Sequence, residues 1–263
     1  FNIFGGLALA GITGIVVIGG LKRIAEVATF LVPLMGSIYF GAMLIALILN
    51  LDLVLPAFRL ILIDAFNGTA IAGGTFFGVL IYGVRRGAFS NEAGMGTESL
   101  VHGVAKVSDP VKQGLVAMTG PIFDTLIICT ATALMILISG VWETSASQGV
   151  TLTAEAFSVL LGNFGGFILF MCVICFGLST IFTYSYYGAS CSRFLFGKFG
   201  MKFYIYLYIF GIFIYSIVPI DIAINIADGA FAMMAIPTLV SALWLAPKVM
   251  QASRNYFKLI DNF

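Results

Sequence analysis

Charged side chains are scarce in this sequence. They make up 10% of the 263 residues, and hydrophobic residues make up 60%, whereas ordinary soluble domains contain about a quarter charged residues. The mean hydropathy is +1.08. A soluble fold cannot bury so many Phe, Ile and Leu side chains, so the composition predicts a membrane protein. The net charge of +1 gives no reason to expect a nucleic-acid partner.

Cysteine and histidine are almost absent. We interpret the single histidine, His102, as a polar group near the cytoplasmic interface and not as a proton relay. Cys172 and Cys175 have metal or redox spacing, but no second pair or nearby histidine supports such a site. No metal triad, no nucleophile with a base and no strand-then-helix context for the glycines is visible, so we predict neither an enzyme nor a cofactor. The cysteines all lie in or at the end of apolar runs, which predicts no disulfide; they are Cys129, Cys172, Cys175 and Cys191.

Long apolar runs take the place of the missing charge. A helix that crosses a bilayer needs about 20 mostly apolar residues, and several segments meet or nearly meet this length. We therefore predict an all-α polytopic membrane protein in which the third spanning helix is interrupted. The predicted spans are Ile3–Ile18, Val27–Leu49, Ile71 to beyond Tyr82, Leu115–Ile138, Phe164–Tyr187, Phe203–Ile220 and Ile226–Leu245.

Basic residues lie in every second connection between these spans, and acidic residues dominate the others. Because Lys and Arg concentrate on the cytoplasmic side, this pattern places the C-terminal tail, residues 247–263, inside the cell and the start of the first span outside. The chain begins on apolar residues, so we expect an upstream portion. The basic residues of the inner connections and tail are Lys22, Arg23, Lys106, Lys112, Arg193, Lys198, Lys202, Lys248, Arg254 and Lys258.

Two outer connections are expected to be ordered. The first, at residues 51–70, mixes Leu and Ile with Arg59 and Asp64, so we predict that it lies along the membrane surface. The second, Ser145–Asn163, is long and partly amphipathic, and we expect it to cover the outer side of the protein.

The segment from Tyr82 to Glu98 is unlike its apolar surroundings. Ionisable groups at membrane depth are costly and usually functional, and closely spaced glycines let the backbone leave helical geometry. Discontinuous helices of this kind form substrate and ion sites in many transporters. The alternative is a cytoplasmic loop between two short helices. The charged residues are Arg85, Arg86, Glu92 and Glu98, and the glycines are Gly83, Gly87, Gly94 and Gly96.

A break over 87–97 has a direct chemical use. Unwinding is expected to free carbonyls from about Gly87 to Ser90 for a sodium ion. Ser90 or Asn91 is expected to cap the second half-helix, whose N–H groups suit the carboxylate of an amino acid. Arg85 and Arg86 close the first half-helix, and Glu92 is near enough in the sequence to pair with one of them.

Two other predicted spans carry polar side chains. In Phe164–Tyr187, Thr180 and Tyr184 share one face and Ser179 and Thr183 the next. These hydroxyls suit a sodium ion, although ordinary helix packing through small residues explains them equally simply. In Leu115–Ile138, Pro121 loosens the helix before Asp124, whose carboxylate is expected either to pair with Arg85 or Arg86 or to bind a cation.

A long motif resembles a known family. The run Arg86-Gly-Ala-Phe-Ser-Asn-Glu-Ala-Gly-Met-Gly96 is similar to the signature of the alanine or glycine:cation symporter family, and further similar segments extend along nearly the whole chain. The resemblance implies a five-plus-five inverted-repeat fold of the LeuT type, with residues 1–50 ending the first repeat and 71–246 forming the second. It also implies sodium-coupled uptake of alanine or glycine by a cell-membrane protein, which we expect to be a monomer. The implied substrate-binding residues are Phe89, Ser90, Asn91, Gly94, Thr180 and Tyr184, beside the ion-binding candidates Gly87, Ser179, Thr180 and Thr183.

The chain departs from the family pattern at two places. Many members have Gly and Trp where this chain has Thr183 and Tyr184, so we expect the preferred amino acid to differ. Residues Thr97 and Glu98 also replace a more usual Ser-Ala after the signature. An alternative hypothesis is a proton-coupled or exchange carrier on the same scaffold, with Asp124 or Glu92 carrying the proton.

Overall fold

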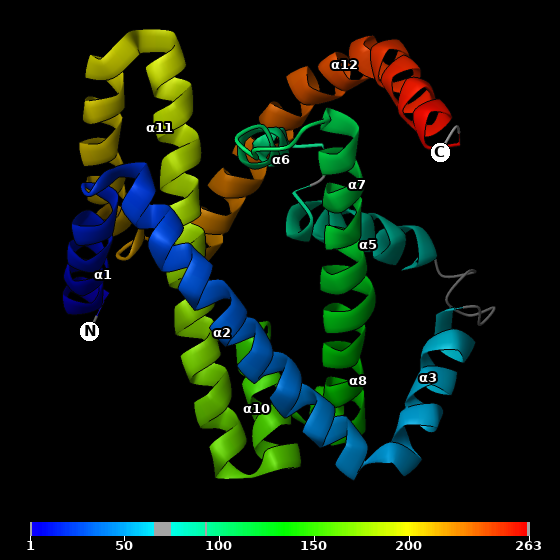
Figure 1. Ribbon diagram of the computed structural model, residues 1–263. Helices are drawn as coiled ribbons and strands as arrows, with labels where there is room; N and C mark the ends of the chain where they lie inside the picture. Colours follow the sequence, from blue (N-terminus) through cyan, green and yellow to red (C-terminus); the bar gives the residue numbers. More distant parts are fainter. Residues whose placement is uncertain (1, 66–74, 93, 262–263) are drawn as a thin grey trace. The chain divides into compact units, whose positions relative to one another are not determined.

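The computed structural model describes residues 2–65, 75–92 and 94–261, and every regular element in these ranges is a helix. Four of the helices are long and apolar enough to cross a membrane, which confirms a multi-pass helical protein. The chain divides into two compact units, one formed by Phe1–Leu62 and Ala131–Ala223, the other by Ile63–Thr130 and Ile224–Phe263. In chain order (Figure 1) the helices are α1 Asn2–Val17, α2 Gly20–Leu49, α3 Leu51–Ala65, α5 Thr75–Ser90, α6 Thr97–His102, α7 Pro110–Pro121, η1 Ile122–Cys129, α8 Thr130–Ser139, α9 Val141–Thr144, α10 Val150–Leu161, α11 Asn163–Tyr215 and α12 Ile220–Asp261.

The first unit is built around α11, which packs against α1, α2 and α10. Its 53 residues form two arms that fold back on each other, as Figure 1 shows, because Gly197 has φ 69° and interrupts the helix. This positive φ is readily accessible only to glycine. The Tyr208 hydroxyl of the second arm donates to the Ile181 carbonyl of the first at 2.8 Å. The two predicted spans in this region are therefore distinct helices, although helical geometry resumes directly after the turn.

A small apolar core joins α1, α2 and α11. Val17, Ile24 and Phe182 are almost fully buried there. Tyr39 of α2 extends the packing, with its ring 5.5 Å from that of Phe157 and its hydroxyl 2.7 Å from the Thr132 hydroxyl of α8. Such buried Tyr side chains combine large apolar contact with a satisfied hydroxyl, which positions α2 against its neighbours.

The second predicted outer connection is helical between Val150 and Leu161. Ahead of it, the Ser147 hydroxyl donates to the Glu155 carboxylate at 2.6 Å. Hydrogen bonds from Ser145 and Ser147 hold the pKa of Glu155 below its ordinary value, because they stabilise the charged form. The connection is thus ordered, as its sequence predicted.

The second unit contains α5, α6, α7, η1 and most of α12. Asp109 caps α7 by accepting from the Val111 N–H at 2.8 Å, with Pro110 at the first helical position. The helix continues through η1, a π-helical stretch, into α8, so that Pro110–Ser139 forms one apolar span. The wider π-helical turns begin directly after Pro121, which has no N–H to donate to the ladder.

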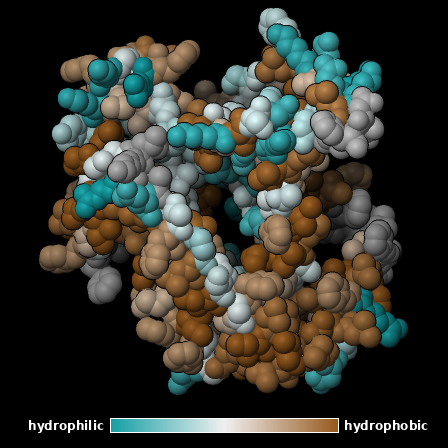
Figure 2. All heavy atoms as spheres, viewed as in Figure 1, coloured by the Kyte–Doolittle hydropathy of each residue, from teal (hydrophilic) through white to brown (hydrophobic). Residues whose placement is uncertain are grey.

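Many large hydrophobic side chains are exposed, and brown, hydrophobic residues cover much of the face shown in Figure 2. The most apolar stretch of α12 has no buried residue at all. Apolar surface on this scale requires lipid or protein around it. The first predicted outer connection is largely a helix, α3, and the predicted C-terminal tail continues α12 as helix to Asp261.

Candidate functional site

A break within the predicted range separates two helices, and it begins after Ser90 and not at Gly87. Helix α5 remains helical through Ser90, and α6 begins at Thr97. Between them, Glu92, Gly94 and Gly96 have φ values of 53°, 79° and 85°. A positive φ costs a residue with a side chain about 1–2 kcal/mol, so Glu92 marks a strained position of the kind that clusters at functional sites.

Two details of the predicted break are wrong. The carbonyl of Gly87 is not freed, because it accepts the Asn91 backbone N–H at 3.1 Å and the Asn91 side-chain amide at 3.0 Å. The second half-helix is capped neither by Ser90 nor by Asn91; its N-cap is Gly96, which contributes no side-chain bond. The glycines after Asn91, and not Gly87, release the backbone from helical geometry.

The end of α5 meets the π-helical segment η1 in a cluster of polar side chains. The Ser90 hydroxyl donates to the Asp124 carboxylate. Asn91 and Thr125 exchange two hydrogen bonds, 2.9 Å from the amide to the threonine oxygen and 3.1 Å in the reverse direction. π-helical turns are rare and frequently occur at functional sites. Here two consecutive residues of the π-helical segment, Asp124 and Thr125, contact the polar residues that end α5.

The arginines of α5 have partners that the sequence analysis did not name. Arg85 forms an ion pair with Asp228 of α12, not the predicted pair with Asp124. Arg86 lies over the ring of Tyr82, 5.1 Å from its centroid. A cavity of about 330 Å³ adjoins the ion pair and is lined by small and apolar side chains, among them Ala88, Met95 and Phe231. Arg85 thus links the first half of the broken helix to α12.

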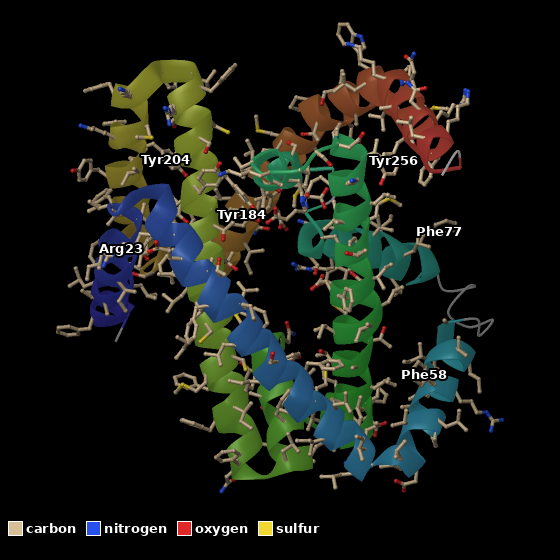
Figure 3. The ribbon with its side chains drawn as sticks, in the orientation of Figure 1. Arg23, Phe58, Phe77, Tyr184, Tyr204 and Tyr256 are labelled. Atoms are coloured by element: carbon tan, nitrogen blue, oxygen red, sulfur yellow. The ribbon has the colours of Figure 1, made fainter. Side chains whose placement is uncertain are left out.

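The remaining predicted residues lie in the first unit, on the first arm of α11. The Thr183 hydroxyl donates to the Ser179 carbonyl at 2.9 Å, and the Ser179 hydroxyl donates to the Phe176 carbonyl at 2.9 Å. Thr180 is exposed, and the half-buried Tyr184, labelled in Figure 3, stacks at 5.3 Å against Tyr187. The hydroxyl oxygens keep lone pairs, so these contacts are compatible with either ion binding or helix packing.

The structure therefore brings together Ser90, Asn91 and Asp124 and adds Thr125 to them. It describes the α11 residues as a separate group in the other unit. The predicted residue Phe89 has its side chain outside the described part of the structure. The sequence did not lead us to select Asp228 as a partner for Arg85, although it is a charged residue inside an apolar run, which is a usable signal. Among the described residues, no three His, Cys, Asp or Glu side chains gather to hold a metal ion.

Comparisons with known proteins agree with the motif. The family model described as "Sodium:alanine symporter family" matches residues 2–262. The chain is 36% identical to the uncharacterized transporter YflA of Bacillus subtilis, over 98% of this chain and 56% of that protein. It is 34% identical to the sodium/alanine symporter AgcS of Methanococcus maripaludis, over 98% and 57%. It is 32% identical to the probable sodium/glutamine symporter GlnT of Bacillus subtilis, over 95% and 53%. The chain spans about half the length of these curated relatives.

Proposed function

The chain belongs to the sodium:alanine symporter family, and from this premise we propose that it contributes to the binding centre of a sodium-coupled symporter that carries alanine or glycine into the cell. The proposed architecture is a five-plus-five inverted repeat. In it, α1 and α2 end the first repeat, and the helices from α5 to α12 form the second. The basic connections place the C-terminus on the cytoplasmic side.

The observation that carries this proposal is the break between Ser90 and Thr97 together with its polar contacts. A helix of 16 residues such as α5 extends about 24 Å. If α5 starts at one membrane surface, the break at its end therefore still lies inside a hydrocarbon core about 30 Å thick, toward its far side. Non-helical backbone at that depth is tolerated only where protein or a water-filled cavity surrounds it, which is the setting of a substrate site.

Each group in the break has a role that its chemistry supports. The proposed donors for the substrate carboxylate are the first backbone N–H groups of α6, at Thr97 and Glu98, because a helix leaves its first N–H groups without helical partners. The Ser90 hydroxyl and the Asp124 carboxylate supply oxygen atoms for sodium, a hard cation that prefers oxygen. Asn91 is anchored to the end of α5 by its bond to the Gly87 carbonyl, and it holds that end against η1 through Thr125. It therefore keeps the break in register with Asp124.

The α11 residues are proposed on their chemistry and on the family resemblance alone. Ser179, Thr180 and Thr183 supply hydroxyl oxygens to the ion, and Tyr184 limits the size of the substrate pocket. Relatives are named for alanine and for glutamine, so pocket size is the property in which members of the family are expected to differ. Because Thr183 and Tyr184 stand where many members have Gly and Trp, we propose that these two positions set the preference of this chain among small neutral amino acids.

Uptake measurements test the proposal. Vesicles containing the full-length protein should accumulate labelled alanine or glycine only with an inward sodium gradient. Asn91→Ala should reduce uptake strongly while the protein still reaches the membrane. Asn50→Ala is the matched control, because Asn50 also donates to a carbonyl four residues earlier, at 2.8 Å, but lies at the end of α2. Uptake that follows a pH gradient without sodium contradicts the proposal and supports a proton-coupled carrier.

A further inference from the structure

The last part of α12 differs in character from the spanning part. Pro247 lies inside the helix, and the helix changes direction in its final, red-coloured part in Figure 1. Proline removes a ladder hydrogen bond and is a usual cause of such a bend. The residues that follow it form a helix that is free to take an orientation other than that of the spanning segment.

This terminal helix is amphipathic. At 100° per residue, Val249, Ala252 and Tyr256 fall on one face, and Gln251, Arg254 and Lys258 fall on the opposite face. Lys248 lies at the boundary between the two faces. A basic amphipathic helix next to a membrane span is typical of a segment that lies in the plane of an anionic membrane surface. Trp244, 81% exposed one turn earlier, is a residue type enriched at that level of the bilayer.

The apolar face of this helix borders a groove shared with the start of α7. The groove has a volume of about 620 Å³ and mostly apolar walls. Gly114, Leu115 and Met118 form the α7 side, and Leu245, Val249 and Ala252 form the α12 side. Met118 and Val249 are 69% and 63% exposed, so these side chains do not fill the groove themselves. Because Gly114 has no side chain and nothing lies within 4 Å of where a Cβ would be, the α7 wall remains open.

One cation stands at the edge of this apolar space. Lys248 lines the groove, at the border between the apolar and polar faces of the terminal helix. Lys112, in the first turn of α7, contacts the Ser108 hydroxyl at 3.3 Å and adds positive charge to the same end of the unit. An apolar groove that ends at a basic residue near the bilayer surface matches the two parts of an anionic phospholipid, its acyl chain and its phosphate.

We propose that this groove is a binding site for an anionic phospholipid, with an acyl chain between α7 and α12 and the phosphate at the Lys248 ammonium group. Burial of each acyl CH₂ is favourable, and the ammonium–phosphate contact selects anionic over zwitterionic headgroups. Pro247 directs the terminal helix so that its apolar face covers the acyl chain. The site is separate from the broken helix, and it does not depend on the transported substrate.

Quenching of Trp244 fluorescence tests this site without any transport measurement. The full-length protein is reconstituted after its other tryptophans, including Trp142, are replaced by phenylalanine. Vesicles of phosphatidylcholine contain an increasing mole fraction of brominated lipid. This lipid is phosphatidylglycerol in one series and phosphatidylcholine in the other. Bromine quenches only at short range, and Trp244 is the neighbour of the groove residue Leu245. Brominated phosphatidylglycerol should therefore quench at a lower mole fraction than brominated phosphatidylcholine.

Two variants separate a site from general attraction to the surface. Lys248→Gln should raise the phosphatidylglycerol fraction needed for half-maximal quenching about fivefold, the effect of one basic residue near an anionic surface. Lys198→Gln is the charge control, because Lys198 lies between the arms of α11. It should leave the phosphatidylglycerol fraction for half-maximal quenching unchanged. Gly114→Leu should lower quenching by filling the groove, whereas Gly120→Leu, on the same helix with equally open space, should not.

Equal quenching by the two brominated lipids overturns the proposal. So does a phosphatidylglycerol preference that survives both Lys248→Gln and Gly114→Leu, since the preference would then come from the summed basic charge of the tail. Circular dichroism of each variant shows whether the helices are retained. If Lys248→Gln has lost its helices, it is replaced by Lys248→Met, which keeps a long apolar side chain but not the charge.

Discussion

Gly96 is the position at which a single methyl group should disturb the broken helix most. It caps α6 with a φ of 85°. A Cβ added there would lie 2.7 Å from the Thr238 hydroxyl oxygen of α12 and 3.6 Å from its methyl carbon. The substitution Gly96→Ala therefore combines backbone strain with a close contact to a neighbouring helix.

The expected cost has two parts. A left-handed backbone costs a residue with a Cβ about 1–2 kcal/mol. The 2.7 Å contact requires the Thr238 side chain to move, and that hydroxyl also donates to the Met234 carbonyl at 2.9 Å. Moving a side chain away from its preferred rotamer costs about 0.5–1.5 kcal/mol. We therefore expect Gly96→Ala to destabilise the protein by about 1.5–3.5 kcal/mol, the sum of the two contributions.

Thermal melting of the purified full-length protein in detergent measures this loss, which should lower the melting temperature by several degrees. Thr238→Ala removes both of the closest atoms and leaves the Thr238 Cβ at 3.8 Å. In that background, Gly96→Ala should therefore lose only the backbone part of its cost. The difference between the two backgrounds gives the contact energy directly as a double-mutant cycle.

Gly83→Ala is the matched control, because Gly83 is helical within α5 and nothing lies within 4 Å of its added Cβ. It should be neutral or stabilising, since alanine favours a helix over glycine by about 1 kcal/mol. The reasoning would be refuted by a Gly96→Ala protein that melts with the parent. An equal loss in both backgrounds would show that Thr238 plays no part in the effect.

Two further changes test the contacts between helices. Tyr208→Phe should cost about 0.5–1.5 kcal/mol of stability, because it deletes the 2.8 Å hydrogen bond to the Ile181 carbonyl; Tyr206→Phe, 65% exposed on the same arm, should melt with the parent. Asp228→Asn should lower the melting temperature slightly, because half-exposed pairs contribute at most about 1 kcal/mol. The double exchange Arg85→Asp with Asp228→Arg should restore most of that loss, and a double variant as unstable as the sum of its single variants would argue against the ion pair.

Much of the fold was predictable because the membrane restricts what a sequence can form. Apolar runs of sufficient length become helices that satisfy their own backbone groups. The glycines at 94 and 96 mark the break for the same local reason, since they allow positive φ at no steric cost. The helical ends were less predictable: α5 continues to Ser90, and α12 continues past the expected end of its span. The end of a helix depends on the helix propensity of the local residues, and this propensity does not fall at the residue where the apolar run ends.

The partners of the polar residues were not predictable in the same way. Arg85 and Asp228 are separated by 143 positions, and Ser90 and Asp124 by 34. Proximity in the sequence could not point to Asp228, which the α12 helix brings to Arg85. The π-helical geometry of η1 was also not visible in the hydropathy pattern, because a uniformly apolar run does not show whether its backbone bonds follow α-helical or π-helical spacing.

The sequence by itself determined the class of protein, the approximate spans, the existence of a break near residue 90 and, through its motif, the family. These follow from length, hydropathy and backbone freedom, which are properties of neighbouring residues. The tertiary structure decided that Asn91 and Thr125 bond to each other, and that Thr238 restricts Gly96. These contacts join helices that are distant in the chain, so only the packing of the folded protein selects them.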